Sequence, residues 1–247
     1  MRLSTVVEER FATVPVLILA GGLGSRLRSA YAAGPKVMAP INGRPFLAYV
    51  LRTVQQAGLR RIILCVGYKC EHIEHWLSDG QSLGIDVKYS QENEPLGTAG
   101  ALRLGAMRFC PRERFFAVNG DSILHLDFRA MLEAHDKRGA RASIALANVQ
   151  NTSRYGSVDV DAHGNVRAFG EKSGSYVGGY INGGVYLFEP EVLESIPDGC
   201  AVSLEREVLP VLASRGLVAF MSDGYFIDIG VPEDFLRAQS EIEELLP

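Results

Sequence analysis

The stretch LILAGGLGSRLRSAYAAGPK, residues 17–36, leads an apolar run directly into a loop rich in glycine. The run itself, VPVLILA at 14–20, predicts a buried β-strand because it is short, continuous and rich in branched side chains. In an open α/β sheet, the loop after such a strand lies at the edge where ligands bind. Glycines let this backbone approach a ligand and turn N–H groups toward oxyanions, and Arg26, Arg28 and Lys36 add positive charge. The stretch therefore predicts a phosphate-binding loop.

Two familiar phosphate loops do not match this stretch. A Walker A loop ends in Gly-Lys-Ser/Thr, and the dinucleotide fingerprint needs a third glycine where this chain has Leu27. The missing glycine disfavours a dinucleotide-dependent oxidoreductase. When the loop is taken alone, the alternative is a surface turn whose arginines are merely solvated.

The rest of the first half alternates apolar runs with helical patterns. Strands are predicted at 61–66, 84–89, 115–121 and 142–147, and helices at 44–59, 70–80 and 97–109. Such alternation favours a largely parallel sheet that is covered on both faces. The expected fold class is α/β, with a Rossmann-like, doubly wound, mostly parallel sheet.

After about residue 150 the segments become shorter and richer in turns. Residues 155–169 alternate apolar and polar side chains around an Asp-Ala-His-Gly-Asn turn, which predicts a hairpin. Residues 183–193 predict a strand that leads into a helix, and residues 230–246 predict a terminal helix with Pro232 near its start. No linker or repeat requires a second unit, so a single domain over 1–247 is expected.

The composition limits the partners and the compartment. The 25 Lys and Arg residues are outnumbered by 29 Asp and Glu, and the net charge of −4 argues against a surface built for nucleic acid or anionic membrane. The four cysteines, Cys65, Cys70, Cys110 and Cys200, form no CxxC pair, which favours reduced thiols in a cytoplasmic protein. No apolar run approaches the ~20 residues that cross a bilayer.

Two carboxylates are candidates for a metal site. Asp121 follows a predicted strand in VNGDSI, and Asp228 ends the apolar run in FIDIG. Mg²⁺ prefers oxygen ligands and keeps phosphates and waters in its shell, so the pair could hold one Mg²⁺ beside a bound phosphate. Each aspartate alone could equally be a turn or cap residue.

Several motifs along the chain together resemble the sugar-1-phosphate nucleotidyltransferase family. They are LAGGLGSRLR at 19–28 with Pro35-Lys36, PLGTAGAL at 95–102, NGD at 119–121, Glu171-Lys172, YINGGVYLF at 180–188 and IDIGVPEDF at 227–235. Within the family, GSRLRSAYAAGPKVMAPINGRPFL at 24–47 is most similar to the heptose-1-phosphate guanylyltransferases. The resemblance implies a glycosyltransferase-A-like nucleotidyltransferase fold, with a nucleotide-binding half at about 14–150 and a small, β-rich sugar-binding half at about 151–247.

The resemblance also implies a reaction and its residues. A nucleoside triphosphate, with GTP favoured, and a sugar 1-phosphate would give an NDP-sugar and pyrophosphate, most simply GDP-heptose for a capsule or other surface polysaccharide. The implied catalytic residues are Arg26, Lys36, Asp121, Lys172 and Asp228, with Mg²⁺ on Asp121 and Asp228. The implied nucleotide-binding residues are Leu19, Ala20, Gly21, Gly22, Gly24, Ser25, Gln91, Gly97 and Thr98. The implied sugar-binding residues are Tyr155, Gly156, Glu171, Lys172 and Asn182.

Some alternatives stay open at this point. Another base, or mannose or glucose in place of heptose, would keep the reaction class. A nucleotide-sugar sensor without catalysis is disfavoured because a pure binder does not need every charge at the reacting phosphates. Tyr155 could simply be a packed aromatic residue, and GTAG at 97–100 could be a tight helix start with small residues for packing. A homo-oligomer is compatible with the sequence but not required by it.

Overall fold

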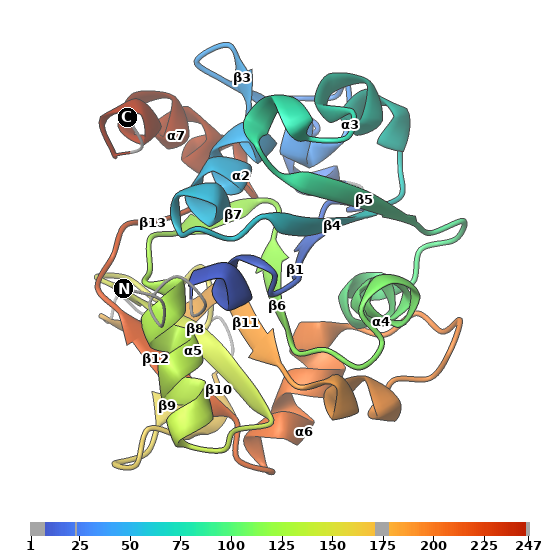
Figure 1. Ribbon diagram of the computed structural model, residues 1–247. Helices are drawn as coiled ribbons and strands as arrows, with labels where there is room; N and C mark the ends of the chain where they lie inside the picture. Colours follow the sequence, from blue (N-terminus) through green and yellow to red (C-terminus); the bar gives the residue numbers. More distant parts are fainter. Residues whose placement is uncertain (1–7, 23, 171–177, 246–247) are drawn as a thin grey trace.

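A computed structural model describes residues 8–22, 24–170 and 178–245 (Figure 1). In this part of the chain, seven strands form one sheet in the order β12-β8-β11-β6-β1-β4-β5. The strands are β1 (Val16–Leu19), β4 (Arg61–Val66), β5 (Asp86–Gln91), β6 (Phe115–Asn119), β8 (Ala142–Val149), β11 (Gly179–Phe188) and β12 (Val218–Ser222). The five strands predicted in the first half are all present, so that part of the prediction is confirmed.

The sheet is mostly parallel, as predicted. β11 is the exception, because it runs antiparallel to both of its neighbours, β6 and β8. The remaining pairs, β12 with β8, β6 with β1, β1 with β4 and β4 with β5, are parallel. Short two-stranded pairs lie outside the sheet: β2 (Pro40–Ile41) with β3 (Arg44–Pro45), β7 (Ser122–Leu124) with β13 (Phe226–Asp228), and β9 (Val158–Val160) with β10 (Val166–Phe169).

The helices cover both faces of the sheet. They are α2 (Phe46–Gln56), α3 (Cys70–Leu77), α4 (Gly97–Phe109), α5 (Phe128–Lys137), α6 (Leu209–Ala213) and α7 (Pro232–Leu245). The single-turn elements are η1 (Ser25–Leu27), η2 (Lys36–Met38), η3 (Gln81–Leu83), η4 (Pro190–Ser195) and the π-helix η5 (Leu204–Val208). The helix predicted after β11 is a 3₁₀-helix of six residues that begins at Pro190.

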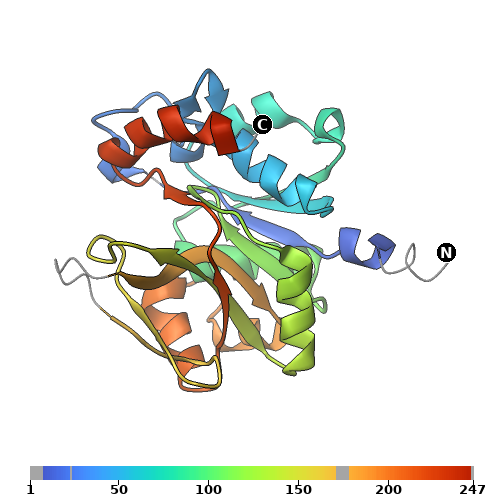
Figure 2. The ribbon, with the colours of Figure 1, turned by 90° about the vertical axis from the view of Figure 1, so that its left-hand side faces the viewer.

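The two faces bury separate parts of the core, and β1 shows why. Its side chains alternate across the sheet, so Val16 and Ile18 belong to the core that includes residues of α2, α5 and α7. Leu17 belongs to the core on the opposite face, which includes residues of α4, η5 and α6. On the first face, the C-terminal helix α7 lies next to the β2–β3 hairpin (Figures 1 and 2). Gln239 fixes this contact by exchanging hydrogen bonds with the backbone of Pro40 and with Asn42. The helices within the described ranges do not combine the length and the apolar character that a membrane span needs.

Candidate active site

A cavity of about 860 Å³ lies where the parallel strands end. Its wall includes Leu19 at the end of β1, Gly67 after β4, Gln91 at the end of β5, and Asn119 at the end of β6. Ligands in open α/β sheets bind at this edge because the loops after parallel strands meet there. We refer to this space as the main cavity.

Most residues that the sequence predicts for nucleotide binding and catalysis line the main cavity. This set consists of Leu19, Gly21, Gly22, Gly24, Arg26, Lys36, Gln91, Gly97, Thr98, Asp121 and Asp228. Ala20 is buried behind the wall, and Ser25 begins η1. Glu171 and Lys172 lie outside the described residues. Segments that are distant in the sequence therefore line the same cavity.

The glycines of the first loop differ in what they allow. Gly24 alone among Gly21, Gly22 and Gly24 lies in the left-handed region, with φ of +58°, and a Cβ there would lie 2.9 Å from Lys36 Cβ. A Cβ on Gly21 would lie 3.0 Å from Glu92 Oε1, whereas a Cβ on Gly22 would meet no protein atom within 4 Å. Gly21 and Gly22 therefore do not use the positive φ that glycine allows, and Gly22 borders space that the protein leaves open.

Lys36 joins the two predicted metal carboxylates. Its Nζ lies 2.6 Å from Asp121 Oδ2 and 3.7 Å from Asp228 Oδ1, with 10% of the lysine side chain exposed. Asp228 Oδ1 also accepts a hydrogen bond from the backbone N–H of Gly230. Burial raises the pKa of the Asp228 carboxyl above its ordinary value, and the nearby charge of Asp121 raises it further, partly opposed by Lys36.

These two carboxylates fit a divalent cation. Within the ranges that the structure describes, Lys36 supplies the one ammonium in contact with them, so two negative charges face a single positive charge. Among the described residues, no third His, Cys, Asp or Glu joins them in a metal-binding group. The other ligands of a bound Mg²⁺ would then be water and phosphate oxygens, which is the shell that this ion prefers.

The β7–β13 pair explains how Asp228 reaches Asp121. Asp228 is the last residue of β13 and pairs with Ser122, the residue after Asp121, in the antiparallel ladder. The backbone N–H of Ile229 then donates to the carbonyl of Asp121 at 3.0 Å. The small sheet therefore sets the separation of the two carboxylates.

The start of α4 is built against the second half of the chain. The N–H groups of Ala99 and Gly100 donate to the carbonyl of Val202, and a Cβ on Gly97, whose φ is +67°, would lie 2.5 Å from that same oxygen. This close packing is the alternative that the sequence left open for GTAG. Although Gly97 lines the main cavity, what requires a glycine at this position is the Val202 backbone.

Glu92 and Glu205 in the wall were missed from the sequence. Glu92 accepts a hydrogen bond from the Leu96 N–H at 3.0 Å and packs under Gly21 and Gly67, and burial raises the pKa of its carboxyl. Glu205 comes from η5, in the second half of the chain. Glu92 directly follows Gln91, so its position after β5 was a usable signal, but Glu205 stands in no recognisable motif.

The predicted sugar-binding residues within the described ranges do not line the main cavity. Tyr155 packs edge-on against Phe226, and its hydroxyl donates to Asp234 at 3.4 Å. Burial raises its pKa, with contributions from the charges of Asp234 and Asp228. Gly156 follows in the same turn, with φ of +84°. Asn182 donates from Nδ2 to the Tyr186 hydroxyl at 2.8 Å.

A glycine-rich loop, two cations and two carboxylates around one cavity in a mostly parallel sheet define a nucleotide-handling α/β enzyme. The chain belongs to the nucleotidyl transferase family, whose model matches residues 15–244. The family membership expected from the sequence motifs is confirmed.

Individual relatives agree with this assignment. The chain is 39% identical over 231 residues to the D-glycero-alpha-D-manno-heptose 1-phosphate guanylyltransferase of Aneurinibacillus thermoaerophilus, a match that covers 93% of this chain and 99% of that protein. It is 35% identical to the mannose-1-phosphate guanylyltransferase of Mycobacterium tuberculosis, over 93% of this chain and 64% of that protein. The crystal structure of HddC from Yersinia pseudotuberculosis complexed with GMP-PN superposes with a TM-score of 0.82 at 34% identity, over 93% of this chain and 100% of that one. The first two relatives are named as guanylyltransferases, and this protein is likewise a transferase.

Proposed function

We propose that this protein transfers a guanylyl group from GTP to a sugar 1-phosphate, with D-glycero-α-D-manno-heptose 1-phosphate as the preferred acceptor. The heptose 1-phosphate guanylyltransferase matched over 99% of its length supports the choice of substrates. The meeting of Lys36 with Asp121 and Asp228 in the main cavity is the observation that supports catalysis, because a pure binder does not need charges of both signs at the reacting phosphates.

The bond changes follow from the substrates. An oxygen of the sugar 1-phosphate attacks the α-phosphorus of GTP, and the bond from that phosphorus to the bridging oxygen of the β-phosphate breaks. The GDP-sugar keeps the α-phosphorus, and pyrophosphate leaves with the bridging oxygen. Since two anions must approach each other, cations placed around the phosphates supply most of the catalysis by reducing their repulsion and stabilising the charge that develops in the transition state.

We assign Arg26, which is exposed at the wall of the main cavity, to the β- and γ-phosphates, and Lys36 to the α-phosphate. Asp121 and Asp228 would hold Mg²⁺, which when bound neutralises phosphate oxygens. Lys172 is assigned to the phosphate of the sugar and Glu171 to its hydroxyls, on the resemblance alone. In this scheme the chain is a single domain with a nucleotide-binding half and a sugar-binding half. The protein works in the cytoplasm.

Mannose 1-phosphate is the second candidate acceptor. The Mycobacterium tuberculosis relative named for that substrate is 35% identical, although this chain spans only 64% of it. Both candidates share the base and the reaction, so the sugar alone separates them.

The test is Mg²⁺-dependent pyrophosphate release with GTP, ATP, CTP, UTP and dTTP, each paired with the heptose, mannose and glucose 1-phosphates. We expect release with GTP and the heptose to exceed every other pair. Release with a different pair would keep the reaction class and replace the substrates. Nucleotide binding by folded protein without any release would instead favour a sensor.

A further inference from the structure

Glu205 brings a carboxylate from the second half of the chain into the wall of the main cavity. It lies in the π-helix η5, a wide turn that is uncommon in proteins and frequent at functional sites. The turn begins at Ser203, whose hydroxyl accepts the Arg206 N–H as a cap. Glu205 is therefore held on a short, fixed element next to α4.

One oxygen of this carboxylate is anchored and the other is not. Oε2 accepts hydrogen bonds from the hydroxyls of Thr98 at 2.8 Å and Ser203 at 3.2 Å. Within the described part of the chain, Oε1 accepts no hydrogen bond, and no Lys, Arg or His nitrogen lies within 4 Å of the carboxylate. A half-buried carboxylate without an ion partner needs further donors, because burial removes the water that would satisfy it.

The hydrogen bond to Glu205 also explains the role of Thr98. Its hydroxyl donates to Glu205 and accepts the Leu204 N–H at 2.7 Å, so the only hydrogen that this side chain can donate is already used. Thr98 therefore serves to orient Glu205, which is a different role from the nucleotide contact expected from the sequence.

Position and charge restrict what Glu205 can bind. A phosphate is excluded, because it would bring further negative charge against an uncompensated carboxylate. Glu205 also lies close enough to Tyr186 of β11 for its charge to raise the pKa of the buried tyrosine, after the larger effect of burial. Tyr186 in turn contacts Asn182, a predicted sugar-binding residue.

The sheet order separates Tyr186 from Gln91, the predicted nucleotide-binding residue at the end of β5. Gln91 ends β5, at one edge of the sheet, whereas Tyr186 lies in β11, with β6, β1 and β4 in between. We propose that Glu205 accepts a hydrogen bond from a ring hydroxyl of the sugar 1-phosphate and so selects the acceptor sugar. This inference rests on the proposed reaction, since it assigns a residue to the second substrate of that reaction.

The first test compares Glu205→Gln with Glu207→Gln. Gln keeps an oxygen for Thr98 and Ser203 but replaces the free acceptor with an amide, whereas Glu207, two positions further on the same π-helix turn, accepts the Ser203 N–H and stays outside the cavity lining. We expect Glu205→Gln to raise the KM for the sugar 1-phosphate by about 10- to 100-fold, the effect of losing a hydrogen bond to a charged group, while the KM for GTP changes less than about twofold. Glu207→Gln should leave both constants unchanged.

Deoxy sugars provide the second test. Among mono-deoxy analogues of the acceptor, the one that lacks the hydroxyl bound by Glu205 should bind the wild type much more weakly than the full sugar does. For Glu205→Gln, the difference in affinity between that analogue and the full sugar should largely disappear. Calorimetric titration with the sugar 1-phosphate alone measures this coupling even if Glu205→Gln reacts slowly, and binding of GTP shows that the variant is folded.

The outcomes separate the two claims. Pyrophosphate release by the wild type together with an unchanged sugar KM in Glu205→Gln would overturn the inference and keep the proposed reaction. The inference would also be overturned if Glu205→Gln raised the KM for GTP and left the KM for the sugar 1-phosphate unchanged, because the carboxylate would then contact the nucleotide. No release from the wild type with any pair would overturn the proposed reaction, and no binding of any sugar 1-phosphate would overturn both.

Discussion

The Nζ atom of Lys36 lies 2.6 Å from Oδ2 of Asp121, in a contact that bridges η2 and the turn after β6. With Asp228 Oδ1 at 3.7 Å, the ammonium occupies the space between the two carboxylates that we assign to a metal ion. The same side chain is assigned to the α-phosphate. Lysine and a divalent cation therefore compete for the same carboxylates until a nucleotide offers the lysine another anion.

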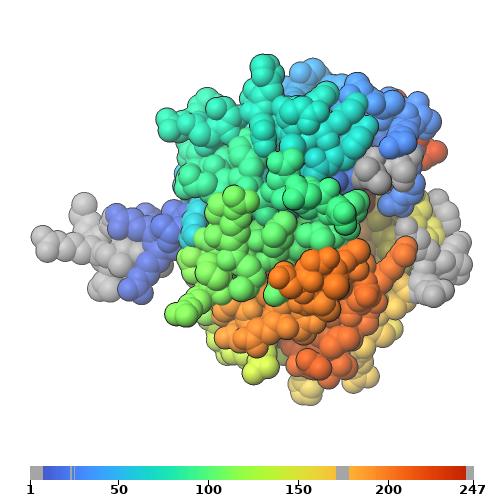
Figure 3. Space-filling view, turned by 90° about the vertical axis from the view of Figure 1, so that its right-hand side faces the viewer, coloured from blue at the N-terminus to red at the C-terminus, as the bar shows by residue number. Residues whose placement is uncertain are grey.

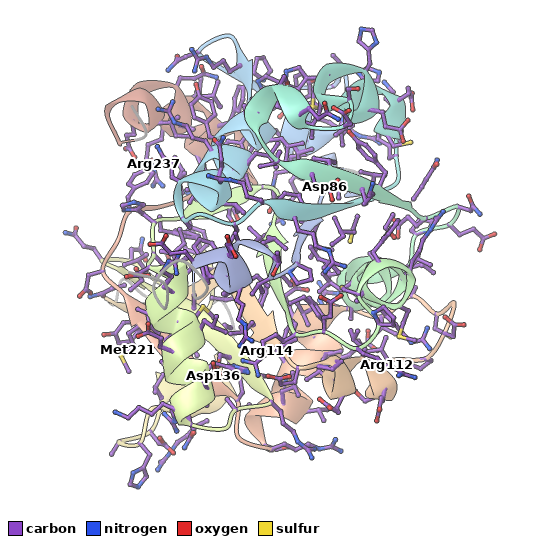
Figure 4. The ribbon with its side chains drawn as sticks, viewed as in Figure 1. Asp86, Arg112, Arg114, Asp136, Met221 and Arg237 are labelled. Carbon is purple, nitrogen blue, oxygen red and sulfur yellow. The ribbon has the colours of Figure 1, made fainter. Side chains whose placement is uncertain are left out.

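Substitution of Lys36 by Met should separate these two roles. Removing the ammonium leaves Asp121 and Asp228 facing each other without a countercharge, so the affinity of the nucleotide-free protein for Mn²⁺ should rise about tenfold. Pyrophosphate release should fall by a factor on the order of 10²–10³. Electron paramagnetic resonance of free Mn²⁺ measures the first effect. Exposed Asp86, labelled in Figure 4, offers a control as Asp86→Asn, which should change neither value. Unchanged or weaker Mn²⁺ binding by Lys36→Met would contradict the competition.

Gly97→Ala should destabilise the protein. The new methyl group would lie 2.5 Å from the Val202 carbonyl oxygen, and an alanine would be strained at a φ of +67°. Figure 3 shows this junction at the surface, where the green residues around 100 lie against the orange segment around 200. We expect the free energy of unfolding to fall by about 1–3 kcal/mol, as for an overpacked site. Urea denaturation measures the change, and unaltered stability would mean that the junction can open without cost.

Gly22→Ala is expected to behave in the opposite way. The added Cβ meets no protein atom within 4 Å and the residue does not need a positive φ, so stability should change by less than about 0.5 kcal/mol. If the loop backbone contacts the triphosphate, the methyl group will intrude on the ligand and weaken GTP binding. Titration calorimetry with GTP tests this expectation. Equal GTP affinity in wild type and variant would show that the nucleotide does not approach Gly22.

The central strands could be predicted because their signal is local. β1, β4, β6 and β8 are continuous apolar runs, and such runs are typical of strands that are buried on both faces. The direction of β11 could not be predicted, because an apolar strand has the same composition whether it runs parallel or antiparallel to its neighbours. The glycine-rich loop could be recognised for the same reason as the strands, since its glycines and cations stand within 20 residues.

The rest of the site depends on contacts between distant segments. The hydrogen bond from Thr98 to Glu205 joins residues 107 positions apart, and neither residue has a local pattern that indicates the other. Gly97 was predicted to line the nucleotide site, but the backbone that requires a glycine there lies at Val202. Tyr155 contacts Asp234, 79 positions further along the chain, so its partner also depends on the tertiary fold.

His135 should make stability fall in mild acid. Its ring is buried on α5, with Nδ1 2.8 Å from the Ser143 hydroxyl and Nε2 3.3 Å from Glu189 Oε1. Burial lowers its pKa, and the charge of Glu189, which also contacts Arg114, only partly opposes this effect. Figure 4 shows Arg114 and Asp136 beside each other at the edge of the same network.

The sign of the effect follows from which state binds the proton. The unfolded chain protonates His135 near its ordinary pKa of about 6.5, whereas the folded protein resists protonation until lower pH. The free energy of unfolding should therefore decline below about pH 6.5, with this residue contributing at most about 1.4 kcal/mol per pH unit. Urea denaturation at pH 7, 6 and 5 should show a flatter dependence for His135→Gln than for the wild type, and exposed His75→Gln should retain the wild-type slope. Identical slopes in all three proteins would mean that His135 takes up its proton as readily in the folded protein as in the unfolded chain.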